Sequence, residues 1–389
     1  MRIGLITYYF PPENYASAAR VGPFVEAWSE EGDTVQVFTH RRVQEGEEVF
    51  SGTDRVRIHR TPFGKADHTR SLPVRFVFEL LFCVLTVGAV LRRRVDVLVA
   101  MSPPFLVAVT TLVLSKLTGI PFVIDGRDLF PEQLFAYDVV RRESLFGRAL
   151  KWLEVQIYDH ALLVVGVTQG LCAHIRERAR SDVVLVRNGV DSHHFYRDEE
   201  APSNDAFVLL FHGKLARSQN VELLVAYAHR LKQEGIRDVK VRVLGYGPKT
   251  EMLEEGIQTY GLEAFIEYLG HIDFGSVPDH LNRADVGLSP RMNGVVNETA
   301  FPVKIYECLA CGLPVIVTPK GEAGQYVEKH KVGFEHSNDD LEGIHQSIMR
   351  LKKKEGLYRE YSERAVRLAD TFDRHALGRT LREEIVDRL

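Results

Sequence analysis

Residues 297–318 read N-E-T-A-F-P-V-K-I-Y-E-C-L-A-C-G-L-P-V-I-V-T and form the most informative stretch of the chain. The pattern predicts a polar loop, a short helix from about Val303 to Cys311, and a buried strand from Pro314 to Thr318. Gly312 supplies the left-handed conformation that ends a helix, and Pro314 cannot continue it. The strand is apolar throughout, as in a sheet that is covered on both faces.

The start of the predicted helix suits an anionic or hydroxyl-rich ligand. Its first N–H groups lack partners and point, with the positive end of the helix dipole, at whatever precedes it. Lys304 adds a positive charge, and Glu307, one turn further in, offers a carboxylate that could hold a diol. The helix pattern alone also allows a core helix with Glu307 at its rim.

Length and composition indicate an ordinary two-domain globular protein. A chain of 389 residues is too long for one core. The charged fraction of 26% and hydrophobic fraction of 45% are typical of soluble proteins. A net charge of −4 without a basic tail gives no reason to expect nucleic acid as a partner. Cys308 and Cys311 form a single C-x-x-C inside the predicted helix, so we expect reduced cytoplasmic thiols and no metal site.

One segment raises the question of a membrane. No signal peptide is expected, because a strand-like run follows Met1-Arg2 at once. Residues 74–91 are strongly apolar, but the uninterrupted part, 80–91, is too short to span a bilayer. Residues 55–94 hold nine Lys or Arg against Asp67 and Glu79. This excess beside an apolar helix predicts a cytoplasmic protein with peripheral contact on the inner face of the cell membrane. A solvated basic face is the alternative.

Strand-like and helix-like segments alternate along the chain, which predicts parallel sheets with right-handed crossovers. The polar run 192–205 has no core-forming pattern. We therefore expect a first α/β domain over 1–193 and a second over 206–373, with the expected active site in the cleft between them. Segment 374–389 has apolar residues at helical spacing and is expected to pack back on the first domain. The strand candidates are 3–10, 34–39, 56–59, 96–100, 121–124, 161–168, 183–186, 207–212, 240–244, 265–269, 286–289 and 314–318.

Common catalytic and nucleotide-binding fingerprints are missing. No G-x-G-x-x-G follows the first strand, and the P-loop, G-x-S-x-G and H-E-x-x-H patterns do not occur. The second domain instead carries F-H-G-K-L at 211–215, where Lys214 could neutralise a diphosphate. Strands that end in glycine follow at L-G-Y-G, 244–247, and L-G-H-I, 269–272. Gly245 and the neighbourhood of His271 could let a flat base pack against backbone.

In this order and spacing, the motifs resemble the retaining, nucleotide-sugar-dependent glycosyltransferases of family 4. That family has the GT-B fold, in which two Rossmann-like, doubly wound domains face each other across a cleft. The resemblance covers nearly the whole chain. Its motifs are the P-P-x-x loop after the first strand, N-G-V-D at 188–191, G-K-L at 213–215 and Y-E-C-L-A-C-G-L-P-V-I at 306–316. Residues 99–105 and 124–132 are similar to the branch for O-antigen, capsule and exopolysaccharide, whose members commonly use lipid-linked acceptors.

The resemblance implies a donor site in the second domain. Glu307 would bind the ribose hydroxyls of the nucleotide. Lys214, beside Gly213, stands where the family usually has an arginine on the diphosphate, and Gln219 stands where it often has a lysine. The resemblance implies a nucleotide-sugar co-substrate, with UDP favoured, and no metal or other cofactor.

Several positions depart from the family pattern. The family has two glutamates separated by seven residues; counted back from Glu307 the first falls on Thr299, one residue from Glu298. Either Glu298 acts through a bulge, or the loop with Pro302, Val303 and Lys304 takes its place. The family's glycine pair in the first loop is replaced by Tyr15 and Ala16.

The acceptor side also departs from the pattern. The family's usual His-Asp reads Arg127-Asp128, so a histidine-based role is not expected. Asp128 and Glu132 are candidates for orienting the acceptor, although Asp128 could merely cap a helix.

Charge then determines the expected mechanism. Lys214 and the helix start near Val303 would stabilise the departing diphosphate, which takes the acceptor proton itself. Two other functions remain open on the sequence. A sugar-nucleotide epimerase on the same fold would need acid/base groups on both sides of the sugar, which Arg127 does not favour. A non-catalytic, sugar-nucleotide-binding partner subunit is supported only by the departures.

Overall fold

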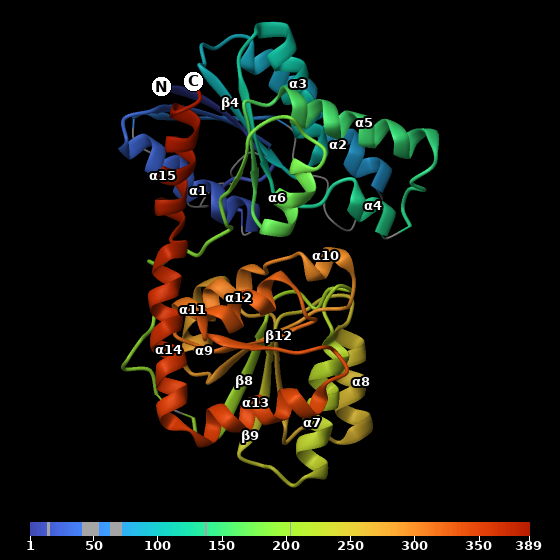
Figure 1. Cartoon of the computed structure of the whole chain (residues 1–389), viewed down its shortest axis with the longest axis vertical. Coiled ribbons are helices and arrows are strands. Elements are labelled where there is room, and N and C mark those ends of the chain that lie inside the picture. Colours follow the sequence, from blue (N-terminus) through green and yellow to red (C-terminus); the bar gives the residue numbers. More distant parts are fainter. Residues whose placement is uncertain (14–15, 41–53, 63–71, 137, 203) are drawn as a thin grey trace. The chain divides into compact units, whose positions relative to one another are not determined.

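The computed structural model describes residues 1–13, 16–40, 54–62, 72–136, 138–202 and 204–389. The chain divides into two compact units, one formed by residues 1–188 with 374–389 and the other by residues 189–373. Each unit has its own parallel sheet with helices on both faces (Figure 1). This architecture confirms the predicted α/β fold with two doubly wound, Rossmann-like domains.

The first unit contains a seven-stranded sheet in the order β3-β2-β1-β4-β5-β6-β7, in which all neighbours are parallel. Its elements are β1 (Arg2–Ile6), α1 (Ala16–Glu30), β2 (Thr34–Thr39), β3 (Val56–Arg60), α2 (Leu72–Val90), β4 (Val97–Ser102), α3 (Phe105–Thr118), β5 (Phe122–Gly126), α4 (Glu132–Ala136), α5 (Leu145–His160), β6 (Leu163–Gly166), α6 (Gln169–Arg176), β7 (Val183–Leu185) and α15 (Arg374–Val386).

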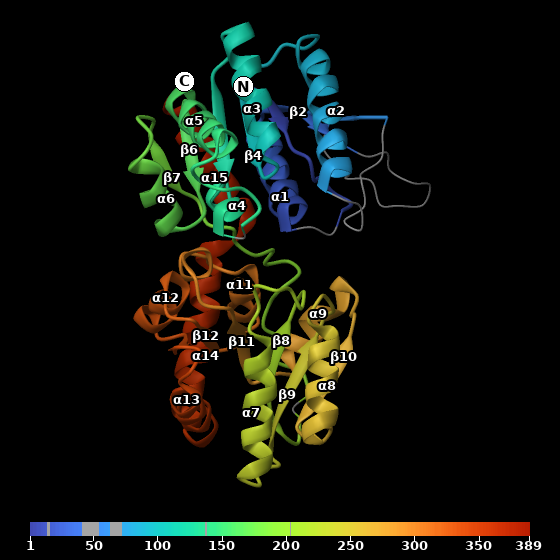
Figure 2. The ribbon, with the colours of Figure 1, turned by 90° about the vertical axis from the view of Figure 1, so that its right-hand side faces the viewer.

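Alternation along the strands gives this sheet two apolar faces. One face packs against α2, α3, α5 and α6, through a core that includes Phe82, Leu114 and Ile157. The other packs against α1 and α15, through Phe24, Trp28 and the two α15 residues Leu381 and Ile385. Figure 2 shows α2, α3 and α5 as a layer in front of the strands.

The last helix, α15, packs against α1 although it is the final element of the chain. Trp28 Nε1 donates a hydrogen bond of 2.8 Å to the carbonyl of Gly378. Gly378 lies so close to α1 that an added Cβ would be 3.0 Å from the Cα of Phe24. Arg382 also pairs with the buried Asp33, with 2.6 Å between Nε and Oδ2. These contacts place α15 in the first unit.

The second unit contains a six-stranded parallel sheet in the order β10-β9-β8-β11-β12-β13. Its elements are β8 (Phe207–His212), α7 (Val221–Gln233), β9 (Val239–Leu244), α8 (Thr250–Tyr260), β10 (Ile266–Gly270), the 3₁₀ turn η1 (Phe274–Ser276), α9 (Val277–Asn282), β11 (Val286–Pro290), α10 (Val295–Glu298), α11 (Val303–Ala310), β12 (Val315–Thr318), α12 (Glu322–His330), β13 (Gly333–Glu335), α13 (Leu341–Lys353), α14 (Glu355–Ala369) and the 3₁₀ turn η2 (Asp370–Phe372).

Three details of this unit differ from the sequence expectation. Asn297 and Glu298 belong to the one-turn helix α10 and not to a loop. The polar run 192–205 contributes Phe195, which is buried in the core. The short edge strand β13 follows α12 where no strand was expected. The predicted end of the helix over 303–311 is confirmed, because Gly312 has a φ of +75°.

Candidate functional site

The strand order of the second sheet reverses between β8 and β11, which lie side by side in the middle of the sheet. In open parallel sheets this reversal opens a crevice at the carboxyl ends of the strands, where ligands bind. Gly213 and Lys214 follow β8, and Arg291 follows β11. The predicted donor residues of this domain therefore come from the edge of the sheet where a ligand is expected.

Helix α11 begins at Val303 without a side-chain cap. Its N-cap residue is Pro302, whose side chain cannot accept a hydrogen bond from the first turn. The N–H groups that open a helix carry partial positive charge, and here the N–H of Ile305 donates to the Pro302 carbonyl at 3.1 Å. Ile305, Tyr306 and Leu309 are buried and hold the helix against the sheet. The start of α11 is thus held in place against the sheet, and its role in binding an anion stays a prediction.

Glu307 lies on α11 and is held by a histidine that the sequence did not single out. His212, the last residue of β8, has its Nε2 atom 2.7 Å from Glu307 Oε2, and both side chains are largely buried. The other ring nitrogen, Nδ1, is buried and has no hydrogen-bond partner among the described residues. Because a carboxylate only accepts hydrogen bonds, Nε2 carries the hydrogen of this contact and donates it to Glu307.

The Lys304 ammonium is enclosed by residues of the same crevice. Its Nζ atom lies 3.7 Å from the centre of the Phe211 ring and 3.2 Å from Gln219 Oε1. Burial, assisted by the positive charge of Arg291, lowers the pKa of Lys304 to about 7. This lysine can therefore gain or lose its charge near neutral pH, and an anion beside it would favour the charged form.

Arg291 is a second cation that the sequence reading missed. Its guanidinium donates two hydrogen bonds to Asn297 Oδ1, at 2.9 and 2.6 Å, and so ties the end of β11 to helix α10. The available signal was its position directly after a buried strand. Arg291 supplies a positive charge near Lys304 in a site where Gln219 replaces the family's lysine.

Two glycines shape the loops around Lys304. Gly213 has a φ of +112°, and an added Cβ would lie 3.8 Å from Lys304 Nζ. Gly245 has a φ of +124°, and an added Cβ would collide with the carbonyl oxygen of Gly213. Positive φ and close backbone contact both require glycine here. The next residue, Tyr246, is exposed and packs edge-on against His271, with 5.3 Å between the ring centres.

Other predicted donor residues are not joined to this group. Lys214 is exposed, and its side chain forms no hydrogen bond or ion pair with any residue that the structure describes. Glu298 is exposed too, and its Oε1 accepts from the backbone N–H of Gly294 at 3.1 Å. The structure therefore brings Gly213, Gln219, Lys304 and Glu307 together, but gives Glu298 a local contact within its own helix.

The predicted residues of the first unit lie at the carboxyl end of β5. Arg127 follows this strand directly, and Asp128 is exposed. Asp128 does not cap a helix, because α4 starts only at Glu132. Glu132 pairs with Arg142. Tyr15 lies outside the described residues, and Ala16 is the first residue of α1, of whose side chain nothing is described.

Within the described part of the chain, no group of three or more His, Cys, Asp or Glu side chains could hold a metal ion. Independence from metal stays a prediction. Cys308 and Cys311 are free and buried, and burial raises the pKa of the Cys311 thiol to about 12. Neither thiol has the lowered pKa that redox or metal chemistry uses.

Comparison with known proteins agrees with this geometry. Residues 16–189 match the model of the glycosyl transferase 4-like domain, and residues 193–367 match that of the glycosyl transferases group 1. The chain belongs to the family 4 glycosyltransferases. As a member of this family it has the GT-B fold, which confirms the fold predicted from the motifs.

One relative and two solved structures show how similar known proteins are to this family 4 glycosyltransferase. WcaL of Escherichia coli strain K12, named as a colanic acid biosynthesis glycosyltransferase, is 28% identical over 171 residues, or 43% of this chain and 42% of the relative. The chain thus spans less than half the length of this relative. Sucrose-phosphate synthase from Thermosynechococcus elongatus has a TM-score of 0.79 at 17% identity, covering 99% and 98% of the two chains. HepE of Anabaena, in complex with UDP and glucose, has a TM-score of 0.72 at 15% identity, covering 100% of both chains.

Proposed function

We propose that this protein is a retaining glycosyltransferase that moves a sugar from a nucleoside-diphosphate sugar, with UDP as the nucleotide, to a hydroxyl acceptor. The observation that carries the proposal is the buried contact between Glu307 and His212 beside the enclosed Lys304. A carboxylate fixed in this way can accept hydrogen bonds from the two ribose hydroxyls. The UDP bound by the solved HepE structure supports the choice of nucleotide.

The positive charges of the crevice suit a diphosphate leaving group. Lys304 and Arg291 lie within the site, the start of α11 adds backbone N–H groups, and Lys214 is unpaired and can turn toward a ligand. Fixed donors aimed at developing negative charge lower the barrier of such a reaction. These groups can do for a diphosphate what a metal ion does in other transferases.

The proposed reaction breaks the bond between the anomeric carbon and the diphosphate oxygen. The bonding electrons leave with the diphosphate, and the sugar ring gains positive charge. The acceptor oxygen forms its bond to the anomeric carbon on the same face, so configuration is retained. Its proton passes to the departing phosphate oxygen. The protein supplies position and charge, and no side chain is required as a base.

We propose that the acceptor is a lipid-linked glycan in the synthesis of a cell-surface polysaccharide. Relatives named for colanic acid and amylovoran synthesis support this class. The first unit adds a physical argument, because acceptors of this kind sit at a bilayer surface. No helix within the described ranges is long and apolar enough to cross a membrane. We propose that contact with lipid is peripheral, through 55–94 and the helices beside it.

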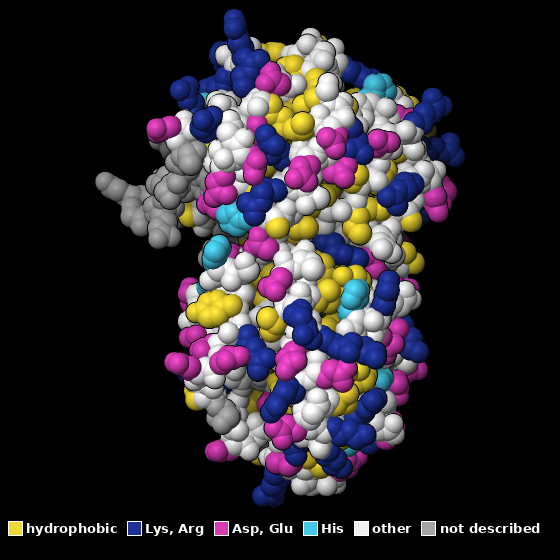
Figure 3. All heavy atoms as spheres, turned by 60° about the vertical axis from the view of Figure 1, so that its left-hand side comes forward, with side chains coloured by type: hydrophobic (Ala, Val, Ile, Leu, Met, Phe, Trp, Pro, Cys, Tyr) yellow, Lys and Arg dark blue, Asp and Glu magenta, His cyan; other side chains and the backbone are white. Residues whose placement is uncertain are grey.

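The surface of α2 supports such a contact. Val77, Leu80 and Val84 recur at helical spacing and are exposed, with Val84 62% exposed, and the exposed Leu91 directly follows the helix. Helix α5 continues the pattern with Leu145, Phe146 and Trp152, of which Leu145 is 85% exposed. By contrast, the face shown in Figure 3 carries interspersed acidic and basic side chains.

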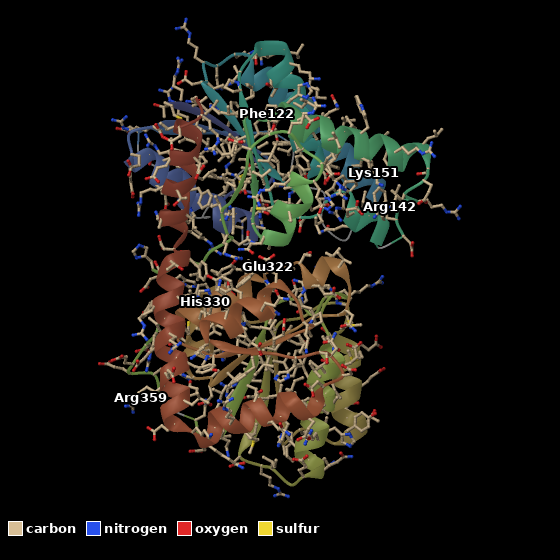
Figure 4. The ribbon with its side chains drawn as sticks, viewed as in Figure 1. Phe122, Arg142, Lys151, Glu322, His330 and Arg359 are labelled. Atoms are coloured by element: carbon tan, nitrogen blue, oxygen red, sulfur yellow. The ribbon has the colours of Figure 1, made fainter. Side chains whose placement is uncertain are left out.

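Basic residues accompany the exposed apolar side chains of α5. Arg142 and Lys151 both lie over the ring of Phe135, at 5.1 and 5.6 Å from its centre, and Figure 4 shows them beside α4 and α5. Apolar side chains with basic neighbours are typical of a helix that rests on an anionic bilayer.

The donor site can be tested by thermal unfolding with UDP, GDP, ADP, CMP and their sugar conjugates in EDTA. A nucleotide present at 100 times its Kd should stabilise the fold by about 2.7 kcal/mol. Lys214→Ala should lower turnover by roughly 10²–10³, and Glu307→Gln should weaken donor binding by about 1.5–3 kcal/mol. Lys240→Ala and Glu254→Gln, exposed residues of the same unit, are the matched controls. Absence of any nucleotide effect would contradict the proposed donor site.

The membrane contact can be tested separately with vesicles. The protein should sediment with vesicles that contain phosphatidylglycerol and not with pure phosphatidylcholine. Val84→Glu should reduce this binding, whereas Val386→Glu, at an exposed position at the end of α15, should not. Equal binding of both variants would exclude α2 from the contact.

A further inference from the structure

The first unit contains a buried ion pair at the core of its sheet. Arg20 on α1 donates to both carboxylate oxygens of Asp125 on β5, from Nε at 2.9 Å and from Nη2 at 3.2 Å. The remaining Arg20 donors reach the carbonyls of Arg187 and Val186, the latter at 3.0 Å. Both side chains of the pair are almost fully buried. Each oxygen of Asp125 therefore accepts a hydrogen bond from Arg20.

Arg127, two residues after Asp125, adds a second positive charge without a partner. Its Nε and Nη1 atoms are buried and have no hydrogen-bond acceptor among the residues that the structure describes. Burial, and next the charge of Arg20, lowers the pKa of Arg127, but a guanidinium stays protonated in proteins. The charges of Asp125 and Asp128 favour the protonated form of Arg127, but neither carboxylate accepts a hydrogen bond from its Nε or Nη1.

An unpaired buried charge is costly, and a fold that keeps one has a use for it. Arg20, Asp125 and Arg127 together carry one uncompensated positive charge. Arg127 as a whole is only partly buried, although its Nε and Nη1 atoms are not exposed. A guanidinium whose buried N–H groups lack acceptors favours a phosphate or carboxylate group as its partner.

The position of Arg127 also suits an anion. Its backbone N–H donates to the carbonyl of Ser102, which ends the neighbouring strand β4. On the other side Gly126 pairs in register with Gly166, and α6 starts three residues after Gly166, at Gln169. The start of α6, where the Thr168 hydroxyl caps the N–H of Leu171, therefore lies at the same edge of the sheet.

We infer that Arg127, supported by the Arg20–Asp125 pair, binds an oxyanion of the acceptor, a phosphate or carboxylate group close to the hydroxyl that receives the sugar. This assignment to the acceptor rests on the proposed function, in which Lys304, Arg291 and α11 of the second unit serve the donor diphosphate. The inference narrows the acceptor to an anionic molecule. Arg127 would recognise an oxyanion in the same way whether the acceptor or the donor supplied it.

The experiment titrates the full-length protein with pyrophosphate, glucuronate or glucose, with UDP saturating and ionic strength held constant. Calorimetry gives Kd, and thermal unfolding gives the midpoint. Pyrophosphate or glucuronate should bind and raise the midpoint, whereas neutral glucose should not. Arg127→Met should weaken this binding by about tenfold or more, the scale of a lost hydrogen bond to a charged group. Arg127→Lys keeps the charge and should retain part of the binding.

The unfolding midpoint without anion separates a binding role from a structural one. Because the charge is unpaired, Arg127→Met should unfold at the same temperature as the unaltered protein or higher, and UDP should still bind. Arg148→Met, which removes an exposed arginine of the same unit, is the control and should change nothing. A lower midpoint in Arg127→Met would overturn the inference, as would anion binding equal to that of the unaltered protein. Anion binding that UDP abolishes would assign the oxyanion to the donor. If the unaltered protein did not bind UDP at all, that result would instead contradict the proposed function.

Discussion

At the residue scale, His212 is expected to affect the affinity of the donor site through its contact with Glu307. It donates to Glu307 at 2.7 Å, so removing its ring leaves a buried carboxylate without this partner. We expect His212→Phe to weaken UDP binding by about 1–3 kcal/mol. Glutamine can place an amide N–H near the position of Nε2 and should restore part of the affinity, whereas asparagine is too short. Calorimetric titration of the three variants with UDP is the measurement. Equal affinity in all three would mean that the contact does not support ribose binding.

Lys304 should make both stability and donor binding depend on pH. Its pKa in the folded protein is about 7, whereas the unfolded chain keeps the ordinary value near 10.5. Between these values the unfolded chain holds more protons, so the free energy of unfolding should rise with pH from about 7 to 10.5. UDP binding should weaken over the same range, because the site loses a positive charge.

The measurement for Lys304 compares the unaltered protein with Lys304→Met, in both the free energy of unfolding and the UDP affinity. Subtracting one from the other cancels the contributions of all other titrating groups. Denaturant unfolding and UDP titration at several pH values between 6 and 10 give the two curves, stability against pH and affinity against pH. This range runs from about one pH unit below the folded pKa to just under the ordinary pKa. A difference that stays flat across this range would show that Lys304 keeps its ordinary pKa.

At the scale of elements, the loops after β8 and β9 depend on each other through Gly245. Alanine at this position would meet the carbonyl of Gly213, and it would also hold a φ of +124°. Gly270, at the end of β10, has a φ of +68° with nothing within 4 Å of an added Cβ. Gly270→Ala should therefore cost about 1–2 kcal/mol for the left-handed conformation alone, and Gly245→Ala should cost more. Denaturant unfolding measures the loss of stability in each of the two variants. Equal losses would mean that the loops after β8 and β9 can move apart without a further loss of stability.

The sequence predicted elements well where the spacing of apolar residues agrees with the residues that end a helix, as in α11, Gly312 and β12. It located Glu307 and Lys304 because both lie on that helix. It missed His212, since a histidine that ends an apolar strand reads as part of the core. It missed Arg291 for a related reason, because only the fold brings β11 beside β8. The unpaired state of Arg127 could not be predicted, because Asp125 and Asp128 both looked available as partners.

At the scale of the whole molecule, the chain leaves the first unit after residue 188 and returns to it at Arg374. Each unit keeps its own core, since the apolar clusters of one sheet contain no residue of the other. Proteins with two such cores often unfold in more than one step. A ligand of one unit should then stabilise only the step in which that unit unfolds.

Leu381 on α15 provides the test of this independence. It is fully buried against α1 and the first sheet, so Leu381→Ala should destabilise the first unit by about 2–5 kcal/mol. Leu389→Ala, at the exposed end of the chain, is the control and should have little effect. In a calorimetric scan with and without UDP, we expect Leu381→Ala to lower the transition that UDP does not shift and to leave the UDP-sensitive one in place. If both transitions fell together, the units would unfold as one, and the return of α15 would couple the stability of the first unit to that of the donor site.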